Sequence, residues 1–364
     1  MLKPRPGILD IAPYVPGRSG AAGIARPIKL SSNETPLGPS PRAVAAFHET
    51  ASTLHRYPEG SSRVLREAIA RHHGLDAERI VCGAGSDELI ALLARAYAGP
   101  GDDVLMSRHG FSMYPIVTRT IGARLIMAPE TNCTASVDAM LAAVTPATRI
   151  VFLANPNNPT GTYLPADEVL RLHAGLGDDV LLVLDSAYAE YAEAEDYDAG
   201  RTLVDAAPNV VMTRTFSKLY GLAALRIGWM YGQEEVVAVM NRMRGPFNVS
   251  IPAMAAGVAA IEDTGFAEAA RAHNREWLPW VAGQLGQAGL EIVPSAANFL
   301  LIRFPAEAGR TADDADVFLT ARGLILRKVA DYGLPDCLRA TIGTEEENRA
   351  LVTALTEFMR IGNG

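Results

Sequence analysis

The segment Arg214–Trp229 places a serine, a lysine and an arginine directly after an apolar run that ends at Met212. A buried lysine is costly, because desolvation disfavours its charged form. Lys218 therefore either lies on a solvated loop, as most lysines do, or serves as an amine nucleophile whose pKa is lowered by burial. Taken alone, Ser217, Lys218 and Arg226 are compatible with both interpretations.

A second segment, Gly83–Leu89, has the sequence GAGSDEL and follows another short apolar run. Its backbone N–H groups, at the start of an expected helix, and the Ser86 hydroxyl could bind a phosphate. Glu88 stands where a dinucleotide fingerprint has its third glycine, and no Gly-Lys-Ser/Thr follows, which argues against that fingerprint and against a P-loop. A helix cap built from small residues explains the segment equally well.

Two further apolar runs also end in polar residues. The segment Asn155–Gly161, with the sequence NPNNPTG, is an irregular turn whose Asn amides can point into a cleft, although it could also be a plain loop. Asp185 follows the run VLLVL, and Tyr188 lies three residues later. A buried carboxylate needs a cationic or hydrogen-bonding partner. The structural alternatives are a helix N-cap for Asp185 and simple packing for Tyr188.

These polar residues share one location if the runs before them are strands of one sheet. Between about residues 60 and 255, short apolar runs alternate with helical patterns, which indicates an α/β fold with a mostly parallel sheet covered on both faces. In such sheets, ligands gather outside the carboxyl ends of the strands. The predicted strands are Arg79–Cys82, Asp103–Ser107, Arg124–Ala128, Arg149–Ala154, Val180–Asp185, Val210–Thr213 and Arg226–Tyr231.

The two ends of the chain have a different texture. Residues 1–44 begin with a stretch rich in proline, glycine and serine, and we expect them to form an arm that packs with a small domain. We expect a large domain over residues 45–255 and a smaller α+β domain over residues 256–364. The helices expected in the smaller domain are Gly265–Ala288, Ala312–Arg322 and a last one from Thr344, and the strands are Glu291–Val293, Asn298–Phe304, Leu324–Arg327 and Cys337–Ile342.

The composition argues against several classes of protein. With 364 residues, 49% of them hydrophobic and 20% charged, the chain is typical of a globular enzyme with two domains. Its net charge of −8 disfavours nucleic acid or an anionic membrane as partner, so an anionic ligand needs a local arginine cluster. The three cysteines lack the spacing of metal ligands, and neither a signal peptide nor an apolar run of about 20 residues is found. We therefore expect a cytoplasmic protein without a metal.

Together, these segments resemble the fold-type I pyridoxal-phosphate (PLP) enzymes of the aspartate aminotransferase superfamily. The Ser-Lys pair followed by Arg226, and the segment NPNNPTG, are specific to this fold type. The segments YVPG, RYPEG and GLILR with LRATIGT narrow the resemblance to the histidinol-phosphate aminotransferases, over almost the whole chain. The resemblance implies a mostly parallel, seven-stranded sheet in the large, PLP-binding domain.

The resemblance also implies a role for each residue of a cofactor site. Lys218 would bond the PLP aldehyde and later move a proton, with Arg226 lowering its pKa, while Asp185 would keep the ring nitrogen protonated. Asn158 and Tyr188 would hydrogen-bond the phenolic oxygen of the ring, and Lys218, Asp185 and Tyr188 form the catalytic set. The resemblance assigns the phosphate to Gly85, Ser86, Asp87, Ser217 and Arg226, ring stacking to Phe111, and contact with the neighbouring subunit's cofactor to Tyr57.

The substrates follow from the same resemblance. Arg327 and Arg339 would grip anionic groups, and Tyr14 and Asn33 of the arm would complete the substrate site. The implied reaction is a ping-pong transamination between histidinol phosphate, or imidazole-acetol phosphate, and glutamate, or 2-oxoglutarate, in histidine biosynthesis by a homodimer with shared active sites. An aromatic amino-acid or dual-specificity aminotransferase and a PLP-dependent phospho-amino-acid decarboxylase stay open. A dinucleotide-dependent oxidoreductase that uses GAGSDE as its phosphate turn is the alternative from another class.

Overall fold

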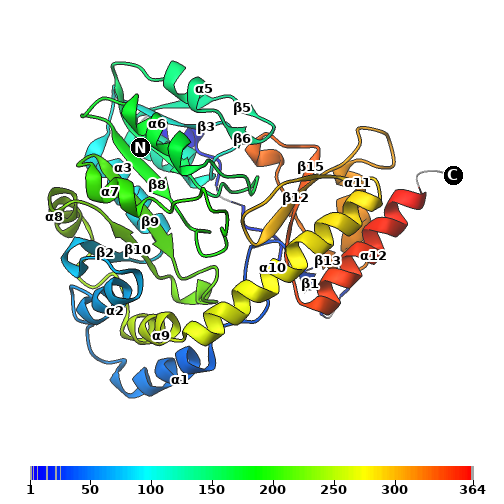
Figure 1. Cartoon of the computed structure of the whole chain (residues 1–364), viewed down its shortest axis with the longest axis horizontal. Coiled ribbons are helices and arrows are strands. Elements are labelled where there is room, and N and C mark those ends of the chain that lie inside the picture. Colours follow the sequence, from blue (N-terminus) through cyan, green and yellow to red (C-terminus); the bar gives the residue numbers. More distant parts are fainter. Residues whose placement is uncertain are drawn as a thin grey trace.

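The computed structural model describes residues 2, 4–5, 7–13, 15–20, 23–24 and 26–361. Its centre is a seven-stranded sheet in the order β2-β10-β9-β8-β7-β3-β4 (Figure 1). Neighbouring strands are parallel except at β10, which is antiparallel to both β2 and β9. The strands are β2 (Ile80–Gly83), β3 (Asp103–Ser107), β4 (Arg124–Ala128), β7 (Thr148–Ala154), β8 (Leu181–Asp185), β9 (Val210–Thr215) and β10 (Gly228–Tyr231).

The mostly parallel, seven-stranded α/β sheet is confirmed, and each predicted strand overlaps an observed one. The ends differ by one residue at β2, β7 and β8, and by two residues at β9 and β10. β9 continues to Thr215, because its last residues pair with β10. β10 begins only at Gly228, because Arg226 has a φ of 52°, in the left-handed region that interrupts an extended strand.

Helices cover both faces of this sheet, which explains why its central strands are apolar throughout. On one face α3, α4 and α8 contribute to an apolar core, and on the other face α2, α5, α6, α7 and α9 contribute to a second core. The helices of this part are α1 (Pro41–Glu49), α2 (Arg63–His73), α3 (Ser86–Tyr97), α4 (Met113–Ile121), α5 (Val137–Ala142), α6 (Ala166–Ala174), α7 (Arg201–Ala206), α8 (Glu234–Met243) and α9 (Ile251–Glu262).

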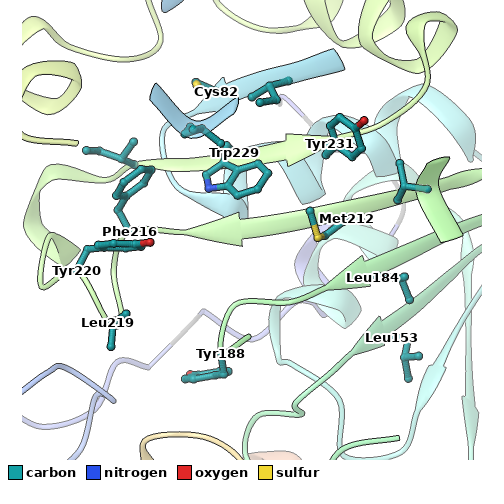
Figure 2. Close-up of a cluster of buried hydrophobic side chains, with 14 of the residues drawn as sticks. Cys82, Leu153, Leu184, Tyr188, Met212, Phe216, Leu219, Tyr220, Trp229 and Tyr231 are labelled. Atoms are coloured by element: carbon teal, nitrogen blue, oxygen red, sulfur yellow. The ribbon is translucent and has the colours of Figure 1, made fainter. Parts of the chain in front are cut away.

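The core under α2 and α9 continues from the strands into the loop after β9 (Figure 2). Strand residues Leu184 and Met212 belong to the same cluster as Phe216 and Leu219, both of which are fully buried. These apolar neighbours fix the loop on both sides of Lys218, whose side chain lines a pocket instead of this core. The loop therefore aims one lysine away from the apolar interior.

A second, antiparallel sheet has the order β11-β12-β15-β14 and carries its own apolar core. The long helix α10 contributes to two cores. Its residues Ala267 and Ala270 belong to the core under α2 and α9, and Val281 and Leu285 belong to the core of the second sheet. Figure 1 shows α10 extending from α9 to lie beside α12. The elements are α10 (Thr264–Gln287), β11 (Glu291–Val293), β12 (Phe299–Arg303), α11 (Ala312–Ala321), β14 (Arg327–Lys328), β15 (Cys337–Thr341) and α12 (Glu345–Ile361).

The sequence prediction of one strand over Leu324–Arg327 is wrong. The chain there forms β13 (Leu324–Ile325), which pairs in parallel with β1 (Ile28–Lys29) of the arm, and then β14, which pairs with β15. The break at Leu326 lets the segment join two different sheets. A small hairpin of β5 (Glu130–Thr131) and β6 (Thr134–Ala135) completes the strands. Within the described part of the chain, no helix has the length and apolarity needed to cross a membrane.

Candidate active site

A cavity of about 220 Å³ lies outside the carboxyl ends of the strands, where the arm and the second sheet approach them. Most of the residues proposed from the sequence line this cavity. The apolar runs predicted to be strands therefore do deliver their polar ends to one place, as expected for an open α/β sheet. The predicted residues that line it are Asn33, Ser86, Asp87, Phe111, Asn158, Asp185, Tyr188, Ser217, Lys218, Arg226, Arg327 and Arg339.

Lys218 reaches this cavity from the tight loop after β9. Backbone hydrogen bonds from Phe216 N–H to the Ile227 carbonyl (3.0 Å) and from Gly221 N–H to the Lys218 carbonyl (3.1 Å) hold the loop. Burial lowers the pKa of Lys218 to about 8, and the positive charge of Arg339 adds to this effect. Arg226, which the sequence analysis expected to be the cause, lowers the pKa of Lys218 less than Arg339 does. Lys218 thus has a neutral fraction near neutral pH.

Asp185 is only 4% exposed and is held by two hydroxyl groups. The Tyr114 hydroxyl donates to its Oδ2 (2.7 Å), and the Thr213 hydroxyl donates to its Oδ1 (3.2 Å). Burial raises the pKa of Asp185 to about 6 in spite of these bonds. No described lysine, arginine or histidine forms an ion pair with Asp185, so a cationic group bound in the cavity would relieve the cost of its burial.

The start of α3 forms one end of the cavity. Gly85, at its N-cap, has a φ of 84°, and a Cβ there would lie 2.5 Å from Arg226 Nη2. Gly228 is equally constrained, since a Cβ added at this position would lie 2.2 Å from the backbone nitrogen of Ser86. Arg226 donates to the Ser217 hydroxyl (3.4 Å) and forms an ion pair with Asp87 (3.2 Å). Helix N–H groups, a serine and an arginine together suit an anion.

Tyr188 and Asn158 also line the cavity. Asn33 donates a hydrogen bond to the Tyr188 hydroxyl (2.7 Å), and Lys218 Nζ lies 5.5 Å from the centre of the Tyr188 ring. Burial raises the pKa of Tyr188 to about 12, so its hydroxyl stays protonated. The Asn158 side-chain oxygen accepts a hydrogen bond from Arg339. Asn33 thus contacts a predicted catalytic residue.

Two arginines from the second sheet also line the cavity. Arg339 donates to the Ser31 carbonyl (2.8 Å). Arg327 donates to the Val15 carbonyl (2.7 Å) and pairs with Asp331 (2.7 Å). Both arginines are buried, although each carries a guanidinium that suits planar or tetrahedral anions.

Two of the described predicted residues, Gly85 and Tyr57, are not among those that line the cavity, although Gly85 precedes the lining residue Ser86 at the N-cap of α3. Tyr57 is 81% exposed and stacks on Phe247 with ring centroids 4.7 Å apart. Its expected contact with another subunit's cofactor stays a prediction. Tyr14 lies outside the described residues.

The structure also adds residues that the sequence analysis missed. Tyr114 holds Asp185, and Tyr332 lines the cavity with its hydroxyl 3.1 Å from that of Ser112. Thr213 was assigned only to a strand. The one signal for Tyr114 is its polar hydroxyl in an otherwise apolar helix face, because a buried tyrosine needs a hydrogen-bond partner. Tyr332 has no such local signal.

Comparisons with known proteins agree with this geometry. The sequence model of the family "aminotransferase class I and II" matches residues 25–355. A histidinol-phosphate aminotransferase of Paramagnetospirillum magneticum is 58% identical over 98% of both chains, and one of Rhodopseudomonas palustris is 57% identical over 98% of both chains.

A crystal structure of histidinol-phosphate aminotransferase from Sinorhizobium meliloti, in complex with pyridoxal-5'-phosphate, superposes with a TM-score of 0.88. It is 28% identical and covers 97% of each chain. The fold is therefore fold type I, as the sequence predicted. The chain belongs to the class I and II aminotransferases and, within them, to the histidinol-phosphate aminotransferase family.

Proposed function

We propose that the protein is a PLP-dependent aminotransferase that exchanges the amino group between histidinol phosphate and 2-oxoglutarate, by a ping-pong mechanism, in histidine biosynthesis. One observation carries the proposal: a single cavity joins a lysine of lowered pKa, a buried carboxylate and two buried arginines. The names of relatives that are 57–58% identical over nearly the whole chain support the substrate.

The residues of the cavity fit PLP. Asp185 is a buried carboxylate that lacks a described cationic partner and could hold a proton on the ring nitrogen. The start of α3, with Ser217 and Arg226, suits the phosphate. Lys218 is an amine of lowered pKa that could bond the aldehyde. When bound, PLP supplies an electron sink next to the amino-bearing carbon of the substrate.

The protein's own side chains then perform the proton transfers. With the cofactor bound, Lys218 Nζ, neutral for part of the time because of its lowered pKa, would take the proton from the amino-bearing carbon of the substrate and hold it for its return. Asp185 keeps its negative charge against the ring nitrogen, and the hydroxyls of Tyr114 and Thr213 orient it. Tyr188 and Asn158 line the same cavity and would supply the hydrogen bonds to the phenolic oxygen of the ring.

Arg327 and Arg339 account for the two different substrates. Histidinol phosphate has a phosphate ester and no α-carboxylate, whereas glutamate has two carboxylates. Guanidinium groups bind both kinds of anion through paired N–H donors. We propose that Arg327 takes the phosphate or the distal carboxylate, with Arg339 beside Asn158 completing the substrate site.

We further propose a homodimer with shared active sites and a cytoplasmic location. Exposed hydrophobic residues Leu54, Tyr57, Val64 and Phe247 support a second copy as partner, and the close approach of residue 60 to the Pro246 carbonyl brings these segments together. Three free, buried cysteines support a reducing compartment. The central sheet and the second sheet have separate apolar cores, which supports an arm over residues 1–44, a PLP-binding domain over 45–255 and a small domain over 256–364.

The purified protein tests this proposal. We expect a visible absorbance that borohydride removes and that Lys218→Ala abolishes. We also expect histidinol phosphate to react in a single turnover far more efficiently than phenylalanine or tyrosine. A colourless protein that cannot take up PLP would contradict the cofactor, and equal reaction with phenylalanine would contradict the substrate.

A further inference from the structure

A second, larger hollow lies beside the active-site cavity, and we call it the basic groove. Its volume is about 690 Å³, and it shares Pro16, Gly17, Arg327 and Tyr332 with the active-site cavity. Its walls come from the arm, from the loop after β3 with α4, and from residues 326–333. The basic groove and the active-site cavity are therefore neighbours, and the four shared residues form the boundary between them.

The charges in the basic groove are predominantly positive. Three of its cations already have carboxylate partners: Arg327 with Asp331, Arg18 with Asp316, and Lys328 with Asp313. Asp331 is the one carboxylate among the described lining residues, which carry five cationic side chains. The cations of the lining are Arg18, Arg108, Arg119, Arg327 and Lys328.

Arg108 and Arg119 remain after these pairs are counted. Both are exposed, and neither guanidinium has a hydrogen bond or ion pair to any described residue. Arg119 lies in the last turn of α4, where a cation stabilises a helix by about 0.3–1 kcal/mol. Helix stabilisation does not explain Arg108, which lies in the loop after β3. It also does not explain why Arg108 and Arg119 line the same groove.

The positive charge of the basic groove is opposite in sign to the net charge of the chain. A protein with a net charge of −8 repels anionic molecules over most of its surface. A groove in which two cations, Arg108 and Arg119, lack a partner among the described residues has the opposite local potential and raises the concentration of anions at its mouth. All of the proposed substrates carry a phosphate or two carboxylates, so they need such a path.

We propose that the basic groove is an anion-capture site, in which Arg108 and Arg119 attract the phosphate or carboxylate end of a substrate and deliver it to Arg327. This inference rests on the proposed aminotransferase function. It assigns Arg108 and Arg119 to the association step, not to the chemical step, because neither lines the active-site cavity.

Rapid mixing of the holoenzyme with limiting substrate tests the proposal. The second-order rate constant of the absorbance change is measured for histidinol phosphate and for glutamate between about 10 and 150 mM ionic strength, where the Debye length falls from about 30 to 8 Å. The variants are Arg108→Gln, Arg119→Gln and the double change. Arg242→Gln on α8 is the matched control, because its guanidinium donates to the carbonyl of Ala238 in its own helix and forms no ion pair with a described residue.

At low ionic strength the double variant is expected to lose about threefold to tenfold in the second-order rate constant and most of its salt dependence. The rate at saturating substrate stays unchanged, and so does reaction with histidinol, which has no phosphate. A double variant with the wild-type rate constant and salt dependence overturns the capture site. A wild-type protein that reacts with glutamate but not with histidinol phosphate overturns the proposed substrate instead, and the glutamate series still tests the basic groove.

Discussion

Arg327 and Arg339 are register partners on the antiparallel strands β14 and β15, and both line the same cavity. Directly opposite residues on neighbouring strands have their side chains on the same face of the sheet. One small sheet thus delivers two buried guanidinium groups side by side. The spacing of the two strands, rather than a flexible loop, sets the distance between the two anion-binding groups.

The first prediction concerns the division of work between these arginines. We expect Arg327→Gln to lower kcat/KM for histidinol phosphate and for glutamate by about 10- to 100-fold, because a hydrogen bond to a charged group is worth about 1.5–3 kcal/mol. Phenylalanine, which has one carboxylate, loses less. Steady-state kinetics with the three substrates measure this, and Arg322→Gln, whose side chain pairs with Glu357, is the control. Equal losses for all three substrates would contradict the assignment.

The second prediction concerns the pH dependence of cofactor uptake. Only a neutral amine attacks an aldehyde, and burial lowers the pKa of Lys218 to about 8. The rate at which PLP-free protein takes up PLP should therefore rise with pH and level off above about 8, whereas a solvated lysine would level off above about 10. Stopped-flow absorbance measures the rate. A rate that keeps rising tenfold per pH unit up to pH 10 would show that Lys218 is not desolvated.

The third prediction concerns the stability of the PLP-free protein. The pKa of Asp185 is about 6 when folded, above its unfolded value of 3.8. Ionised Asp185 therefore destabilises the fold above pH 6, and the cost vanishes below pH 4, where both states are protonated. Asp185→Asn should raise the free energy of unfolding at pH 8 by about 1–2 kcal/mol, less than the full linkage value because one hydrogen bond changes.

Urea denaturation at pH 8 and at pH 4 checks this gain, which should be absent at the lower pH. The surface change Asp138→Asn serves as a control, since Asp138 is exposed and Arg171 is its one ion-pair partner among the described residues. The same Asp185 variant should retain PLP poorly and lose aminotransferase activity. A variant that is no more stable than wild type at pH 8 would mean that Asp185 is better solvated than its burial indicates.

The sequence predicts the sheet and most of the cavity for one physical reason. Apolar runs become buried parallel strands, and the carboxyl ends of parallel strands meet, so Ser86, Asp185 and Lys218 converge without any knowledge of distances. Their exact partners depend on packing across the core. Tyr114 holds Asp185 from helix α4, and the polar hydroxyl is the one trace of this role in its own segment.

Contacts between segments far apart in the chain cannot be predicted from the sequence either, because they also depend on how the elements pack. The strand over Leu324–Arg327 is one apolar run in the sequence, but two separate partners, β1 and β15, divide it. Arg108 also looks like any exposed arginine until the fold places it in the basic groove near Arg119. Local periodicity records neither kind of relationship.

The last prediction concerns a buried ion pair that connects strand β9, which leads to Lys218, with the loop that carries Tyr188. Arg214 Nη2 lies 2.8 Å from Glu190 Oε1, and the two side chains are only 7% and 4% exposed. Glu190 follows Tyr188 by two residues, and Arg214 precedes Lys218 by four. Removing one partner leaves the other charge buried and unpaired, so Glu190→Ala should lower the free energy of unfolding by about 3–5 kcal/mol.

Urea denaturation measures the loss of stability. The exposed ion pair of Arg171 with Glu168 is the matched control, since Glu168→Ala should lower the free energy of unfolding by less than about 1 kcal/mol. Glu190→Gln, which keeps an oxygen for Arg214, should fall between the two. Because the pair also ties the Tyr188 loop to β9, the Gln variant should shift the visible absorbance of the holoenzyme or its pH midpoint. A destabilised variant with an unchanged spectrum would limit the pair to a role in stability.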